Sequence, residues 1–133
     1  MEAKGRPDQT PRFADMLGAI GSESRLRILR LVLAAHPDGM IAGDIQSELG
    51  IPPSTLSHHL EKLRHEGLIL ARREGTFLWY TANVEALREL LVFLYAECCT
   101  RNPVIAPEEI ASLCRCEHGH GQSIQRPFFP GTC

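Results

Sequence analysis

No cysteine occurs before position 98, and all 5 cysteines of this 133-residue chain lie from that position onward. Long apolar runs are also absent, since the longest, LLVFLYA at 90–96, is far shorter than a bilayer-spanning helix. The N-terminus lacks the apolar core of a signal peptide. We therefore expect a cytoplasmic protein with no membrane partner, whose reduced thiols serve metal, metalloid or redox chemistry rather than a disulfide framework.

An excess of one charge is missing as well, because 14 Lys and Arg stand against 16 Asp and Glu and the formal net charge is -2. This balance excludes a broad basic face, so any contact with nucleic acid must be local and modest in extent. The hydrophobic fraction of 44% is ordinary for a soluble protein, and the length fits one domain with a modest core.

What is present is a series of helical patterns with clear breaks between them. Apolar residues recur at helical spacing from Pro11 to Ile20, and Gly21 ends this first helix. Ser22 is suited to cap a second helix over 23–36. One face of that helix carries Leu26, Leu29, Val32 and Leu33.

A pair of helices then precedes a hairpin. A short helix at 41–49 ends at Gly50, and a longer one at 54–65 has an inward stripe of Leu56, Leu60 and Leu63. After Gly67 the pattern predicts two strands within 68–82, joined at Glu74-Gly75, with Leu70, Phe77 and Trp79 as candidate inward residues. The most apolar helix, 84–99, comes last.

This order predicts a mainly α winged helix-turn-helix, α-α-α-α-β-β-α, whose specific signal is the pair 41–49 and 54–65 joined by a tight GIPP turn. We divide the chain into a disordered N-terminus at 1–9, the winged-helix domain at 10–99 and a cysteine-containing tail at 100–133. Five of the 6 histidines lie in the expected recognition helix or the tail, and no nucleophile–base–orienter set is evident, so the chain is not expected to be an enzyme.

The exposed side of helix 54–65 is the candidate DNA-reading surface. Small hydroxyls and an imidazole near a helix N-terminus suit base edges and phosphates, and basic residues near the hairpin tip suit the DNA backbone or minor groove. The residues are Ser54, Thr55, Ser57, His58 and Lys62 on the helix and Arg72, Arg73 and Thr76 on the hairpin. The same residues also fit a solvated helix face with hydroxyl caps, or a protein-interaction module.

Two runs resemble the ArsR/SmtB family of metal-responsive repressors: STLSHHLEKLRHEGLI at 54–69 with RREGTFLWY at 72–80, and ESRLRILRLVL at 23–33. They are similar to that family's recognition helix, wing and second helix. The resemblance implies a repressor that leaves double-stranded operator DNA on binding a metal or metalloid, with the hydroxyls, His58 and the two wing arginines as DNA contacts. His59 is then structural, and Pro53 departs from the polar residue that relatives often have.

The resemblance also implies a homodimer formed through the first and last helices. Two recognition helices would then lie roughly 34 Å apart and match a palindromic operator. The interface residues expected on this basis are Phe13, Leu17, Leu87, Leu90, Leu91, Leu94 and Tyr95.

Two other inducer sites known in the family require cysteines in the helix before the recognition helix, or histidines in the last helix. The stretch IAGDI at 41–45 has no thiol and helix 84–97 has no histidine, so the inducer site is expected at the C-terminal cysteines. Soft thiolates select thiophilic ions such as As(III) and Sb(III). Resemblance to the family's arsenic sensors implies Cys98 and Cys99 as two ligands and Cys116 or Cys114 as the third, with Cys116 preferred as the freer to turn back. In those sensors the third cysteine follows more closely than here.

Other uses of the tail stay open. Cys114, Cys116, His118 and His120 fit a zinc site, which makes zinc a possible alternative ligand. A methylated arsenical needs only the vicinal pair, and Cys98 also fits a buried small apolar residue at the interface. A thiol redox switch is disfavoured because vicinal disulfides are strained, and Cys133 is not expected to be a ligand.

Overall fold

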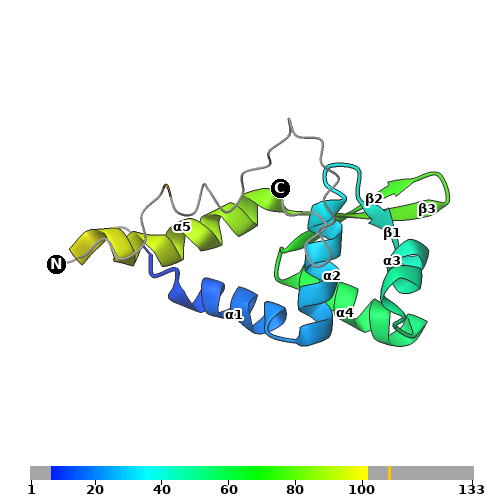
Figure 1. Ribbon diagram of the computed structural model, residues 1–133, viewed down its shortest axis with the longest axis horizontal. Helices are drawn as coiled ribbons and strands as arrows, with labels where there is room; N and C mark the ends of the chain where they lie inside the picture. The colour runs from blue at the N-terminus through cyan, green and yellow to red at the C-terminus, as the bar shows by residue number, and fades with distance from the viewer. Residues whose placement is uncertain (1–6, 102–107, 109–133) are drawn as a thin grey trace.

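The predicted order of helices and hairpin is present in the computed structural model, which describes residues 7–101 and Glu108 (Figure 1). It is a winged helix-turn-helix, mainly helical with a small antiparallel sheet. The elements are α1 (Thr10–Ile20), α2 (Glu23–Ala34), β1 (Met40–Ile41), α3 (Ala42–Leu49), α4 (Pro53–His65), β2 (Ile69–Glu74), β3 (Phe77–Ala82) and α5 (Val84–Arg101). The strand β1 is absent from the sequence prediction because two residues are too few to show an alternating pattern.

The helix boundaries follow local chemistry. The Ser22 hydroxyl accepts a hydrogen bond from the Arg25 backbone N–H at 3.4 Å, which confirms the predicted cap of α2. Gly50 ends α3 with a φ of 67°, a left-handed conformation that glycine adopts without steric cost. At the other end of the chain, α5 continues to Arg101, two residues past the predicted domain boundary at 99.

The core lies where the first four helices meet the base of the sheet. Its most deeply buried large side chains are Met16, Ile28, Val32, Ile45, Leu56, Leu63, Leu68 and Ile69. Of the four residues predicted to share one face of α2, Leu29 and Val32 are buried, whereas Leu26 is 42% exposed. The inward face of α2 is centred on Ile28 and Val32, and Leu26 lies about 160° round the helix from Ile28.

The hairpin has the predicted strands, but the predicted inward face is wrong. The three strands pair antiparallel in the order β1-β3-β2. Leu70, Phe77 and Trp79 do share one face, as the register shows, but Leu70 is 49% and Phe77 54% exposed. The opposite face, which carries Ile69 and Ala82, packs on the core. Because side chains alternate along a strand, choosing the other face changes the burial of every residue.

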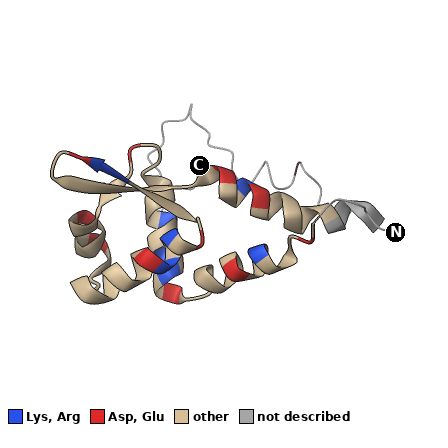
Figure 2. Ribbon diagram, turned by 180° about the vertical axis from the view of Figure 1, so that it is seen from behind, with Lys and Arg blue, Asp and Glu red and all other residues tan. Residues whose placement is uncertain are grey.

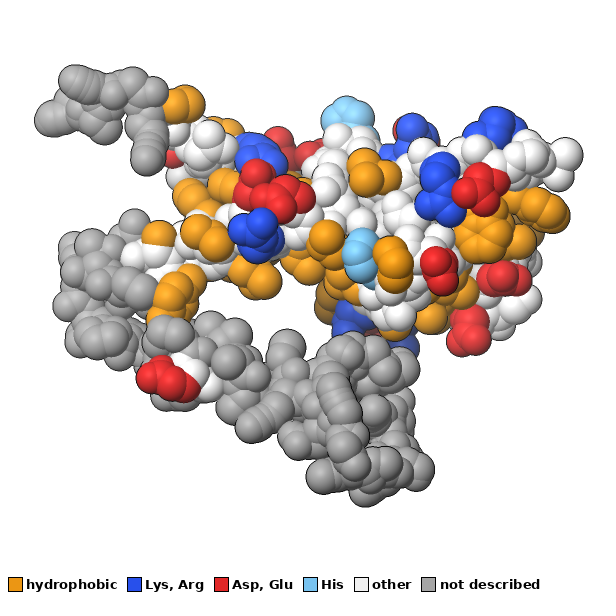
Figure 3. Space-filling model, turned by 90° about the horizontal axis from the view of Figure 1, so that it is seen from above, with side chains coloured by type: hydrophobic (Ala, Val, Ile, Leu, Met, Phe, Trp, Pro, Cys, Tyr) orange, Lys and Arg blue, Asp and Glu red, His pale blue; other side chains and the backbone are white. Residues whose placement is uncertain are grey.

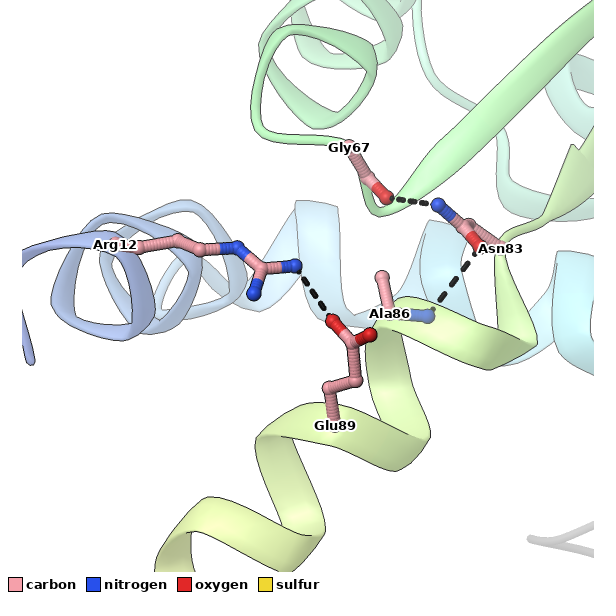
Figure 4. Close-up of polar contacts among 5 residues, drawn as sticks. All are labelled: Arg12, Gly67, Asn83, Ala86 and Glu89. Carbon is pink, nitrogen blue, oxygen red and sulfur yellow. Dashed lines mark hydrogen bonds and ion pairs between the residues drawn. The ribbon is translucent and has the colours of Figure 1, made fainter. Parts of the chain in front are cut away.

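The start of α5 is tied to the turn between α4 and β2 by Asn83 (Figure 4). Its side-chain amide donates to the Gly67 carbonyl at 2.8 Å, and its carbonyl oxygen accepts from the Ala86 backbone N–H at 3.3 Å. The second bond satisfies a donor of the first helical turn that has no partner within the helix. Asn83 therefore fixes where α5 begins and how it leaves the sheet.

Further along, α5 packs against α1. Arg12 and Glu89 form an ion pair at 2.8 Å, and the rings of Phe13 and Phe93 stack with centroids 4.5 Å apart (Figure 4 shows the ion pair). These two helices extend to one side of the molecule, whereas α3, α4 and the hairpin lie towards the other (Figure 1). Among the described helices, none has the length and apolar character to span a bilayer.

Candidate nucleic-acid interface

One apolar stripe seats α4 on the body of the protein. Leu56, Leu60 and Leu63 are buried, which fixes the rotation of the helix about its axis and turns its opposite side to solvent. The turn at Gly50 brings α4 back across α3, so the two helices form a helix-turn-helix pair.

The solvent side of α4 carries the residues predicted to contact DNA. The side chains exposed there include Ser54, Thr55, Ser57, His58 and Lys62. Pro52 precedes the helix, and no side chain caps it. The hydroxyls of the first turn are therefore not used as caps, and the first N–H groups of α4 stay open to an anionic ligand such as phosphate.

Glu61 places a negative charge on the same solvent side, where sequence reasoning assigned it no role. Its carboxylate pairs with Arg64 at 3.3 Å, and both side chains are exposed. Exposed pairs of this kind contribute little to stability. A carboxylate here disfavours phosphate but accepts a hydrogen bond from the cytosine amino group, so Glu61 is suited to base discrimination rather than affinity.

The two wing arginines differ in their surroundings. Arg72 pairs with Glu74 at 2.9 Å and donates to the Asp38 carbonyl at 3.4 Å. Arg73 lies on the other face of the hairpin, is exposed, and has no hydrogen bond or ion pair within the described part of the chain. Thr76 is exposed at the tip. Of the two predicted wing contacts, Arg72 is therefore paired, whereas Arg73 has no ion-pair partner among the described residues.

His59 lies on the flank of α4, half-buried, as expected of a structural residue. Its ring Nδ1 is 3.4 Å from a terminal guanidinium nitrogen of Arg25 on α2. Burial lowers the pKa of His59, and the positive charges of Arg25 and His58 lower it further. The imidazole is therefore held in its neutral form behind the solvent side of α4.

Lys and Arg positions outnumber Asp and Glu positions on α2, on α4 and on the hairpin, whereas α3 carries Asp and Glu positions without a Lys or Arg (Figure 2). The local basic character of this side agrees with the expectation of a confined contact rather than a broad basic surface. The formal net charge of -2 does not prevent such a contact, since the distribution decides the local potential.

The residues expected at a dimer interface fall into three groups by their exposure. Phe13 and Leu90 are buried within the protomer, at 4% and 3% exposure, and therefore serve its own core. Leu17, Leu91 and Leu94 are exposed by 42%, 57% and 49%. Hydrophobic side chains cover much of the visible surface towards the α5 end of the molecule (Figure 3). Leu87 and Tyr95 are half-buried.

Of the predicted inducer ligands, Cys98 and Cys99 lie within the helical backbone of α5, in its last turn. Cys114, Cys116, Cys133, His118 and His120 lie outside the described residues. In the portion of the chain that is described, no group of three or more His, Cys, Asp or Glu side chains is arranged to hold a metal ion.

Comparison with known proteins places this geometry among transcriptional regulators. Residues 20–72 match the model of a helix-turn-helix domain. The chain is 36% identical over 85 residues to the transcriptional activator HlyU of Vibrio cholerae, covering 62% of this chain and 76% of that protein. The solved structure of HlyU superposes with a TM-score of 0.54 over 68% of this chain and 99% of that one.

Two further similarities bear on the family. The chain is 33% identical over 91 residues to a putative arsenical resistance operon repressor, ArsR2, of Halobacterium salinarum, covering 65% of this chain and 76% of that protein. It is also similar to the homodimeric winged helix-turn-helix DNA-binding domain of a possible ArsR-family regulator from Mycobacterium bovis. There the identity is 28%, the TM-score 0.55, and the coverage 72% of this chain and 92% of that one.

Proposed function

The chain belongs to the ArsR family of helix-turn-helix transcriptional regulators, and on that premise we propose that it is an arsenic-responsive repressor. Its homodimer binds a palindromic operator and leaves it when trivalent arsenic or antimony binds the C-terminal cysteines. The observation that carries the choice of inducer is the adjacent pair Cys98 and Cys99 in the last turn of α5, the helix with the exposed apolar residues.

The proposed DNA binding rests on α4 and the wing. The uncapped start of α4 offers backbone N–H groups to phosphate, and Ser54, Ser57 and His58 beside it offer hydroxyls and an imidazole to base edges. Arg73 adds a free cation at the wing. Contacts of these kinds supply both a salt-dependent phosphate component and a sequence-dependent component of affinity.

The proposed homodimer rests on apolar surface that is exposed on the single protomer. Leu91 and Leu94 on α5, together with Leu17 on α1, are large apolar side chains exposed on the two helices that extend away from the wing. A two-fold axis through these helices would bury both copies of each side chain and set the spacing of the two α4 helices.

The proposed binding of the inducer rests on thiol chemistry. As(III) and Sb(III) favour thiolate ligands, and Cys98 and Cys99 supply two of them from α5 itself. Cys116, or Cys114 in its place, supplies the third. Three As–S bonds, each formed as a thiol displaces a hydroxyl group of arsenous acid with release of water, would join Cys116 to Cys98 and Cys99 on α5 and change the relative pose of the two recognition helices. The inducer displaces DNA only through its different affinity for the two poses, typically ~1–3 kcal/mol.

The test is operator binding by the full chain with arsenite, antimonite, methylarsenite, zinc and cadmium added in parallel. We expect arsenite and antimonite to lower operator affinity at least tenfold, the lower part of the range for typical coupling energies. Cys98→Ser and Cys99→Ser should each stay on the operator in the presence of arsenite, whereas Cys133→Ser, the matched control, should respond like the wild type.

Other outcomes redirect the proposal in defined ways. Release by zinc alone, abolished by Cys114→Ser or His118→Ala, would replace arsenic by zinc as the inducer. A response to methylarsenite that survives the loss of both Cys114 and Cys116 would assign the site to the vicinal pair alone. Normal release by both Cys98→Ser and Cys99→Ser would overturn the inducer assignment and leave operator binding intact.

A further inference from the structure

Arg25 occupies an unusual position for a basic residue, the first turn of α2. The N-terminal end of a helix carries partial positive charge, so an arginine there is electrostatically unfavourable. Its guanidinium instead reaches back to α1, where its Nε donates to the Ala19 carbonyl at 2.6 Å. Ala19 is in the last turn of α1, whose carbonyls have no partner within the helix. The Arg25 side chain, at the start of α2, therefore supplies a hydrogen-bond donor to a carbonyl at the end of α1.

The same guanidinium also reaches the recognition helix. A terminal nitrogen of Arg25 lies 3.4 Å from the Nδ1 of His59 on α4. Arginine has only donors, so Nδ1 must be the acceptor, which requires a neutral imidazole protonated at Nε2. The distance is at the long end of the hydrogen-bond range, so this is a contact that small movements of α4 break.

The position of His59 on α4 explains why this contact matters for DNA. His58, the preceding residue, is exposed on the side that faces DNA in the proposed function, and the two rings are 6.2 Å apart. His59 itself is half-buried on the flank of the helix. Arg25 therefore holds α4 from behind its DNA-reading side and does not compete with DNA for it.

We infer that Arg25 is a positioning residue for operator binding, which joins the recognition helix α4, through neutral His59, to the end of the dimerisation helix α1. The inference rests on the proposed operator binding and on α1 as a dimer helix. In a two-fold dimer the separation of the recognition helices depends on how each α4 is held relative to α1, and a palindromic site accepts only one separation. One guanidinium contacts both helices.

Acidification tests this link directly. Protonating His59 removes the acceptor and brings a second positive charge against Arg25, so the contact is lost. The charged or titratable groups that act on His59 are Arg25 from α2 and His58 from α4. His58 is exposed on the side of α4 that faces DNA in the proposed function, so it acts on DNA directly and not through Arg25. Substitution of His59 alone therefore distinguishes its effect on operator affinity from that of His58.

The experiment measures the operator dissociation constant of the full chain from pH 7.5 to pH 5.5 at constant salt. Arg25→Lys keeps the charge but replaces the two guanidinium nitrogens that contact Ala19 and His59 by one nitrogen, so we expect about tenfold weaker binding at pH 7.5 with an unchanged dimer mass, the order of a typical coupling energy. Arg27→Lys, a matched control on the exposed side of α2 with Glu23 as its partner, should bind as the wild type does.

His59→Asn retains an acceptor that does not titrate. It should bind near the wild-type level at pH 7.5, and its affinity should exceed that of the wild type increasingly as the pH falls. His59→Gln gives a second acceptor variant if the asparagine weakens the helix. Equal pH profiles for wild type and both variants, or wild-type affinity of Arg25→Lys, would overturn the inference.

A DNA-free measurement separates this inference from the proposed function. Ring nitrogen NMR of the full chain at pH 7.5 should show His59 neutral and protonated at Nε2, with that state weakened in Arg25→Lys. A charged ring, or one protonated at Nδ1, would refute the link even if operator binding were normal. Absence of operator binding by the wild type with the expected tautomer present would instead refute the proposed function.

Discussion

Arg72 and Arg73 are neighbours in the sequence but differ in whether the guanidinium has an ion-pair partner. Adjacent strand residues face opposite sides of a sheet, so the ion pair of Arg72 with Glu74 leaves Arg73 on the other face, without a partner among the described residues. A free guanidinium is ready to pair with phosphate, whereas a paired one must first give up its partner.

Arg73→Ala should therefore weaken operator binding more than Arg72→Ala. Loss of one phosphate contact reduces the slope of log K against log salt concentration by about 1 for Arg73→Ala. The slope should change little for Arg72→Ala, whose exposed pair contributes about 0–1 kcal/mol to stability. Salt titrations of operator affinity measure both, and equal slopes for the two variants would contradict the assignment.

Glycine at two turns is required for different reasons. Gly39 and Gly50 have φ of 88° and 67°, both in the left-handed region. A Cβ at Gly39 would lie 2.5 Å from the Tyr80 carbonyl oxygen and 2.6 Å from the Thr81 methyl, whereas a Cβ at Gly50 meets nothing within 4 Å. The backbone requirement is common to both, and the steric requirement belongs to Gly39 alone.

Gly50→Ala should therefore lower the free energy of unfolding by about 1 kcal/mol, the cost of a left-handed alanine. Gly39→Ala should cost more, at least about 2 kcal/mol, because β3 must also move away from the new methyl group. Urea unfolding of the two variants side by side checks the difference, and equal losses would mean that the turn at Gly39 yields without strain.

At the scale of one element, α5 depends on its first residues for direction. Asn83 joins the helix start to the Gly67 carbonyl, and Ala86 and Leu90 are buried behind it. The rest of the helix extends along α1, held by the Arg12–Glu89 pair and the Phe13–Phe93 stack. A substitution of Asn83 is therefore expected to change the direction of the whole helix relative to the sheet.

Asn83→Ala should destabilise the protein by about 1–2 kcal/mol, because it removes a cap acceptor and leaves the half-buried Gly67 carbonyl without its donor. Asn83→Ser is the matched control, since its hydroxyl still accepts from the Ala86 N–H. Thermal unfolding should rank the wild type first, then Ser, then Ala. A serine variant no more stable than alanine would show that the cap is not what stabilises the helix start.

The hairpin shows how far an element can be predicted from its own residues. Its strands and turn follow from the change to period-2 patterning after Gly67, and the register of Leu70, Phe77 and Trp79 on one face is as predicted. Which face is buried was predicted wrongly. Both faces carry apolar side chains, so the pattern within the hairpin does not distinguish them, and the packing of the helices against Ile69 and Ala82 makes the choice.

At the scale of the whole molecule, the uncovered apolar side chains of α1 and α5 are the surface that a second copy would bury. Leu91 and Val92 are nearly equally exposed, at 57% and 59%, but lie about 100° apart round the helix. Leu91 is on the side nearer Leu87 and Leu94, and Val92 is further from the buried Leu90. The pair therefore tests which side of α5 dimerises.

Leu91→Glu should produce a folded monomer with weak operator binding. Two copies of a leucine, each contributing at least about 1.5 kcal/mol when buried, correspond to a dissociation constant of the dimer raised about 100-fold or more. Val92→Glu should stay dimeric. Analytical ultracentrifugation with circular dichroism measures both, and a dimeric Leu91→Glu variant would show that the interface lies elsewhere.

The sequence alone determined the kind and order of the five helices and the hairpin, the helix-turn-helix pair, the solvent side of α4 and the gathering of cysteines from position 98 onward. These are local properties, set by apolar period, caps and glycines within a few residues. The tertiary structure decided which hairpin face is buried, which wing arginine is free, which apolar residues of α5 enter the core, and that Arg25 joins α1 to α4. The buried hairpin face, the core residues of α5 and the contact of Arg25 with His59 depend on contacts between segments distant along the chain, for which a local pattern carries no information.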